Sequence, residues 1–138
     1  MFGHPLHPAL VHFPIGLLLS ATAADIAWLA GVIQDGHFGT VLMACGLAMG
    51  LVAMGAGLFD LTRLAEPLVP HAMRHAGTVG AAWLGYSVAL YLRRDSLFGA
   101  ADLSTTTVAV SLLSALLLSF GGWLGGRLVY SFGAGVSK

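Results

Sequence analysis

Charged residues are scarce in this 138-residue chain, at only 9% of the sequence. A soluble domain carries about 25% charged residues, so the shortage excludes an ordinary soluble fold. Apolar residues instead make up 57% of the chain, which is typical of a protein embedded in a lipid bilayer. The six basic residues balance the six acidic ones, and we expect no nucleic-acid partner.

Cysteine is equally sparse, since Cys45 is the only one. A lone cysteine excludes an intrachain disulfide and gives no information on the redox compartment. We interpret Cys45 as a small core residue. The first eight residues lack Lys and Arg, unlike the basic start of a signal peptide. Although Ala21-Thr22-Ala23 resembles a cleavage site, the apolar pattern continues beyond it, and we expect an uncleaved first span.

Four apolar stretches are long enough to cross a hydrocarbon core of about 30 Å, which requires ~20 helical residues. Their predicted bounds are Ala9 to Val32, Phe38 to Leu61, Ala72 to Leu92 and Ser104 to Leu128. The connections are short, which makes consecutive helices antiparallel neighbours. The sequence therefore predicts an all-α fold, an integral membrane up-down four-helix bundle that forms a single domain over residues 1–138.

The distribution of Lys and Arg favours a cytoplasmic location for both chain termini. Basic residues are enriched in cytoplasmic connections. Near the predicted terminal face lie Arg63, Arg74, Arg127 and Lys138, and near the opposite face lie Arg93 and Arg94.

Glycines at helical spacing suggest how the predicted helices pack. Three pairs lie four residues apart, namely Gly46 and Gly50, Gly121 and Gly125, and Gly122 and Gly126. Small residues at this spacing let helix backbones approach closely in lipid, where van der Waals contact drives association. Such crossings would form within one chain or between copies in a homo-oligomer. The same faces could accommodate a flat cofactor, but helix packing is the simpler interpretation.

Histidines gather at the terminal face. His12 lies about one turn inside the first predicted span, His75 about one turn inside the third, and Asp60 at the end of the second. At about 1.5 Å of rise per residue, these three side chains are expected at a similar depth.

Two further histidines, His4 and His7, precede the first predicted span. Pro5 and Pro8 should keep this segment out of regular helix, so that it folds back over the bundle end. Pro14 should kink the first span just below His12.

Imidazole is a common ligand of transition metals and of haem iron. Two arrangements are open. Haem b would be held by His12 and His75, or an Fe, Cu or Zn ion would be held by His4, His7, His12 and His75. Asp60 would ligate directly or orient a histidine. Alternatively, these residues only cap the bundle.

Asp25 lies deep in the first predicted span, where a central Asp costs ~2.5–3.5 kcal/mol on the insertion scale. Its carboxyl therefore needs a partner, and the candidates are Tyr86, Ser87, Tyr91 and Thr105 to Thr107. A structural hydrogen bond is favoured over a proton relay. Of the remaining histidines, His71 is expected in solvent beside Pro70, and His37 is expected to be an ordinary loop residue.

Distinctive segments occur along the whole chain, namely the opening HPLHPALVHFPIGLLLSA, Asp25, GAGLFD, His75 and the closing GWLGGRLVYSFGAGV. Together they resemble the bacterial four-span membrane family catalogued as domain of unknown function 2231. The resemblance implies the bacterial inner membrane but no settled activity. Some relatives resemble fusions to Rieske-type domains or neighbours of electron-transfer proteins, which favours a redox role by association. Many relatives carry Asn where this chain has Val79.

Three functional classes remain. The favoured one is a redox protein that exchanges electrons with a quinone or a separate redox protein. The others are metal-ion binding or transport, and a structural or assembly subunit. The predicted span interiors lack a polar stripe, which argues against an ion pathway, and the chain offers no nucleophile with a base and an orienting acid for a conventional hydrolase.

Overall fold

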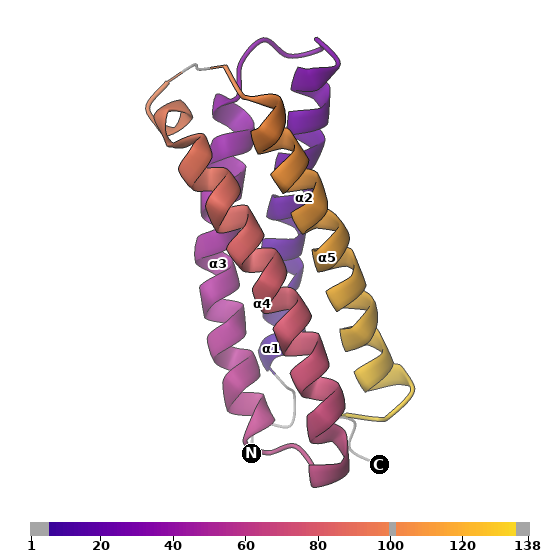
Figure 1. The fold of residues 1–138 in the computed structure, drawn as a ribbon. Coiled ribbons are helices and arrows are strands. Elements are labelled where there is room, and N and C mark those ends of the chain that lie inside the picture. Colours follow the sequence, from indigo (N-terminus) through magenta and orange to yellow (C-terminus); the bar gives the residue numbers. More distant parts are fainter. Residues whose placement is uncertain (1–5, 100–101, 135–138) are drawn as a thin grey trace.

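Four long helices packed side by side form the protein (Figure 1), in a computed structural model that describes residues 6–99 and 102–134. The long helices are α2 (His12–Leu29), α3 (His37–Leu61), α4 (Val69–Leu92) and α5 (Thr105–Tyr130). Three short elements accompany them: α1 (Leu6–Leu10) and the 3-10 turns η1 (Glu66–Leu68) and η2 (Arg94–Leu97). None of the described residues forms a strand. The predicted all-α, antiparallel bundle is confirmed.

The helices form a ring in which each lies beside two others. α2 packs against α3 and α5, and α4 packs against the same two helices. One end of the bundle carries α1, the α3–α4 connection and the last turn of α5 (Figure 1), and we call it the near end. The opposite end, where α2 and α4 finish, is called the far end.

Three helical segments are long and apolar enough to cross a membrane, namely His7–Leu29, His37–Leu61 and Thr105–Tyr130. α4 has 24 residues and a length of roughly 36 Å, but it carries more polar side chains, including Arg74 and His75. A fourth span over Ala72 to Leu92 therefore stays a prediction, supported by the antiparallel packing of α4 between two apolar helices.

The segment before α2 differs from its predicted form. Leu6–Leu10 is helical, so the expectation that proline keeps this part out of regular helix is wrong. Pro8 occupies the first turn, where a backbone N–H has no acceptor within the helix, and its missing N–H costs nothing. Pro14 cannot donate to the carbonyl of Leu10, and the helix is interrupted at Val11, between α1 and α2.

Glycines let the helices approach closely in the bundle core. A Cβ on Gly46 would lie 2.8 Å from the Cγ atom of Leu18, and one on Gly50 would lie 3.0 Å from the Cδ1 atom of Trp83. These missing side chains are replaced by side chains of neighbouring helices, as the packing interpretation predicts. Gly122 has no neighbour within 4 Å of its Cβ position and faces outward.

The hairpin α2–α3 and the hairpin α4–α5 repeat each other with an offset of 68 residues. Asp25 contacts Arg93 and Leu18 contacts Tyr86, and both pairs are 68 residues apart. Buried positions correspond in the same register: Pro14 with Ala82, Ala21 with Ala89, Gly39 with Thr107, Met43 with Ser111 and Gly50 with Leu118. An approximate two-fold axis therefore runs along the bundle, and equivalent residues that touch each other lie on it.

Candidate functional site

His7 reaches from α1 to the backbone of α3 at the near end. Its Nδ1 atom lies 2.7 Å from the carbonyl oxygen of Ala53. Because a carbonyl only accepts, Nδ1 carries a proton and donates it, and in the neutral ring this places the lone pair on Nε2. A Cβ on Gly57 would lie 3.0 Å from the same Nδ1 atom, so glycine at this position makes room for the imidazole.

His75 repeats this arrangement on the other side of the bundle. Its Nδ1 atom lies 2.8 Å from the carbonyl oxygen of Gly121 on α5. A Cβ on Gly125 would lie 2.9 Å from the Cε1 atom of the ring. In both places the imidazole donates to one helix carbonyl and lies over the glycine four residues later. Both histidines are half-buried.

The two imidazoles face each other across the two-fold axis. Their ring centres are 6.1 Å apart, and their planes meet at 72°. Nδ1 and Nε2 flank Cε1 in an imidazole ring, and the Nε2 atom of His75 lies 3.5 Å from the Cβ position of Gly125 on α5. Two imidazoles that share one ion have ring centres roughly 5–6.5 Å apart, given metal–nitrogen bonds of about 2.0–2.1 Å. The observed separation falls within this range.

The partner of His75 across the bundle is His7. His12 is exposed, since five residues further along a helix its side chain points about 140° away from that of His7. Asp60 is half-buried, and no described histidine donates a hydrogen bond to its carboxylate. His4 lies outside the described residues. Within residues 6–99 and 102–134, no three His, Cys, Asp or Glu side chains gather as a metal site.

Asp25 has a partner that differs from every predicted one. Arg93 donates from two guanidinium nitrogens to its carboxylate oxygens, at 2.5 and 2.7 Å. Asp25 is 0% exposed and Arg93 3%. The prediction of Tyr86, Ser87, Tyr91 or Thr105 to Thr107 as partner is therefore wrong. Arg93 follows the last residue of α4 and turns its side chain into the bundle instead of into the far-end connection.

The far half of the bundle interior is more polar than predicted. The hydroxyl of Thr22 lies 2.8 Å from that of Tyr86 and 3.1 Å from that of Ser111. The buried polar residues here and beside them are Thr22, Asp25, Thr40, Arg93, Ser96, Thr107, Ser111 and Ser114. The expectation that the span interiors lack a polar stripe therefore does not hold in this half of the bundle. The sequence did not reveal the buried Ser and Thr residues, because their hydroxyls can donate to carbonyls of their own helix and need no polar partner elsewhere. Ser114, for example, donates to the carbonyl of Val110.

The surroundings of His71, Cys45 and His37 differ from those that the sequence predicted. The ring of His71 is half-buried and lies 4.3 Å from the ring of Phe132, centre to centre, so it is not a simple solvent residue. Cys45 is exposed on the bundle surface, which corrects its interpretation as a core residue. His37 joins the two far-end connections, with Nδ1 2.6 Å from the carbonyl oxygen of Ser96.

Comparison with known proteins shows a family match over nearly the whole chain. Residues 3–138 match the family described as predicted membrane protein, DUF2231. No curated protein and no solved structure matches the chain. The matched region includes both hairpins, the paired histidines and the buried ion pair. The chain belongs to the DUF2231 family of predicted membrane proteins and is a small multi-pass membrane protein.

Proposed function

We propose that the protein binds one transition-metal ion between the Nε2 atoms of His7 and His75 and uses it for electron transfer in the membrane. The observation that carries this proposal is the pairing of two imidazoles, 6.1 Å apart, whose Nδ1 atoms are both engaged by helix carbonyls. A hydrogen bond from the ring nitrogen that does not bind the metal fixes the tautomer and the orientation of a metal-binding histidine. Iron, copper and zinc all accept imidazole, but only iron and copper would transfer electrons.

Further ligands would come from the segment before α1 or from outside the chain. His4 precedes His7 by three residues in the sequence and is the natural candidate for a third imidazole. A quinone or a separate redox protein would exchange electrons with the ion at the near end.

Haem b is the second form of this proposal. Imidazoles on opposite sides of one iron would also have ring centres roughly 6 Å apart, given iron–nitrogen bonds near 2 Å. A macrocycle needs a flat slot beside the iron. The glycines nearest the site, Gly57 and Gly125, are covered by the imidazoles themselves, which favours a bare ion over haem.

A structural role is the alternative, and a specific observation supports it. Each imidazole already joins two helices through its carbonyl bond, α1 to α3 and α4 to α5. One such bond contributes about 0.5–1.5 kcal/mol. The histidines would then hold the near end together without any ligand, as in a structural or assembly subunit.

We also propose that the near end faces the cytoplasm of a bacterial cell. Arg93 is neutralised by Asp25. Among the described residues at the far end, Arg94 is then the one Lys or Arg side chain that has no carboxylate partner. The near end carries Arg63, Arg74 and Arg127. The imbalance is larger than the sequence count suggested, and it follows the rule that basic residues stay in the cytoplasm.

The test is metal content, measured on protein purified in detergent through a tag without histidine. Cells are supplied with iron, copper, zinc and a haem precursor, and the protein is studied by elemental analysis and by absorption spectra of the oxidised and reduced forms. We expect stoichiometric metal in the unaltered protein, and its loss in H7A and in H75A. H12A and H37A are the matched controls and should keep it.

The outcomes separate the alternatives. A Soret band that sharpens on reduction would identify haem instead of a bare ion. Loss of the bound group in H12A, with retention in H7A, would restore the arrangement in which His12 and His75 hold haem. If the unaltered protein holds neither metal nor haem, the structural role is correct.

A further inference from the structure

A second group of polar side chains lies on the outside of the near end, between the first turns of α4 and the last turns of α5. A cavity of ≈ 140 Å³ there is lined by His71, Arg74, Leu124, Arg127 and Phe132. Both arginines are exposed and His71 is half-buried. The cavity is therefore lined by two cationic side chains together with two apolar ones, Leu124 and Phe132.

Aromatic rings, not carboxylates, lie beside Arg127 and His71. The guanidinium of Arg127 lies 5.1 Å from the ring centre of Trp123 and 5.9 Å from that of Phe132. Within the part of the chain that the structure describes, the sole salt bridge is the one between Arg93 and Asp25. The charges of Arg74 and Arg127 are thus available to an anion, and guanidinium suits the two-point binding of phosphate.

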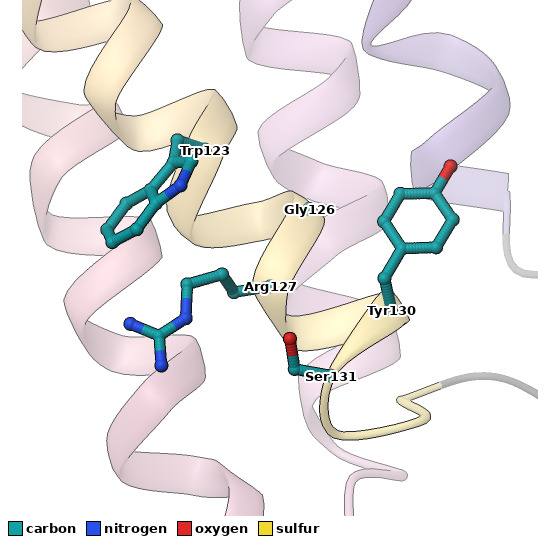
Figure 2. Close-up of a pocket in the computed structure, with 5 residues that line it drawn as sticks. All are labelled: Trp123, Gly126, Arg127, Tyr130 and Ser131. Carbon is teal, nitrogen blue, oxygen red and sulfur yellow. The ribbon is translucent and has the colours of Figure 1, made fainter.

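A neighbouring hollow extends the site along α5. It is lined by Trp123, Gly126, Arg127, Tyr130 and Ser131 (Figure 2), so Arg127 borders both hollows. Trp123 and Tyr130 are 54% and 90% exposed. Exposed Trp and Tyr beside a basic residue at a helix end are typical of the depth at which lipid headgroups lie.

An apolar stripe leads from this site toward the middle of the membrane. Leu113, Leu116, Phe120 and Trp123 follow one another at intervals of three and four residues, which places them on one face of α5 in line with Arg127. All four are more than half exposed, and the rings of Phe120 and Trp123 stack at 5.5 Å. A ligand that fits both parts has a phosphate at one end and a hydrocarbon chain at the other.

We infer that Arg74 and Arg127, with His71, bind the phosphate of an anionic phospholipid whose acyl chain lies along the α5 stripe. Basic pockets between membrane helices are known to hold anionic headgroups. A free phosphate compound shares the headgroup chemistry, but it would leave the stripe and the aromatic residues unused. The lipid is therefore the occupant that the observations favour. This site is independent of the histidine pair and of any metal.

The inference is tested by native mass spectrometry of the full chain in detergent, titrated with phosphatidylglycerol, with phosphatidylcholine or with inorganic phosphate. The double variant R74Q/R127Q should bind phosphatidylglycerol roughly tenfold to thirtyfold more weakly, with phosphatidylcholine unaffected. R63Q is the matched control, because Arg63 also lies at the near end and over an aromatic ring, 4.3 Å from the centre of Phe59, but lines neither hollow. It should bind as the unaltered protein does.

R74Q alone serves if the double variant does not fold, since Arg74 contributes only an exposed side chain. Equal phosphatidylglycerol binding in the unaltered protein and in the variants would overturn the inference. So would an equal loss in R63Q, which would indicate general surface charge. Inorganic phosphate binding that depends on Arg74 and Arg127, without any preference for phosphatidylglycerol, would assign the site to a free phosphate compound and overturn the lipid assignment.

Discussion

Arg93 and Asp25 occupy equivalent positions in the two halves of the bundle and bind each other through two hydrogen bonds on the two-fold axis. His7 and His75 are equivalent in the same register and face each other near the opposite end. The axis thus carries a closed ion pair at the far end and a pair of imidazoles at the near end. In the ion pair the two charges match, although the buried Nε of Arg93 has no hydrogen-bond partner, whereas a neutral imidazole keeps a nitrogen lone pair that a metal can use. This contrast is why we assign ligand binding to the near end.

The buried ion pair should be costly to break from one side. We predict that D25N and R93Q each lower the free energy of unfolding by about 3–5 kcal/mol, because each leaves a buried polar or charged group without its partner. Unfolding in detergent, followed by circular dichroism, measures the effect. The double variant D25L/R93M should be more stable than either single variant, since replacing both charges leaves nothing uncompensated. A double variant less stable than both single ones would contradict this account of the pair.

The glycines beneath the imidazoles should not tolerate a side chain. G57A and G125A each place a methyl group about 3 Å from an imidazole atom, and we predict a loss of about 1–3 kcal/mol in unfolding free energy. The controls are G55A and G122A, whose Cβ positions have no neighbour within 4 Å. These should be neutral or stabilising by about 0.5–1 kcal/mol, because alanine favours a helix over glycine. Equal effects in both sets would show that the imidazoles do not lie over the glycines.

Crossing of the membrane by α4 can be tested by accessibility labelling. In a C45A background, F98C and A65C place single thiols in the connections that follow and precede α4, where both residues are exposed. An impermeant maleimide applied to oriented vesicles should label the two positions from opposite sides. Labelling of both positions from the same side would mean that α4 does not span the bilayer.

Apolar length alone located the helices well. The second predicted span, Phe38 to Leu61, agrees with α3 (His37–Leu61) to within one residue. The reason is that a membrane helix must satisfy all its backbone groups internally, and a long apolar run has no other stable form. The approximate two-fold repeat was not visible, because most equivalent positions hold residues of different size or polarity, such as Gly50 with Leu118 and Met43 with Ser111. His7 with His75 and Gly57 with Gly125 are among the few identical pairs.

The sequence predicted a histidine cluster at the near end, and the structure brings His7 and His75 together there instead of His12 and His75. His12 was chosen as the partner of His75 because the two residues were expected at equal depth. The direction of the His12 side chain around the helix axis was not considered, and it depends on where α1 begins. Arg93 was missed because it follows the apolar run of α4 and looked like a connection residue. Arg93 could have been found only indirectly, because Asp25 lies deep in a span and its carboxylate needs a cation at a similar depth.

X-ray absorption at the edge of whichever metal the purified protein contains identifies the ligands of that metal. We predict that the unaltered protein shows imidazole scattering from two histidines, with metal–nitrogen distances of about 2.0–2.1 Å. H75A, if it still holds metal at all, should show one imidazole fewer, and H12A should match the unaltered protein. A spectrum without imidazole scattering, or one that H75A leaves unchanged, would contradict metal binding by His7 and His75.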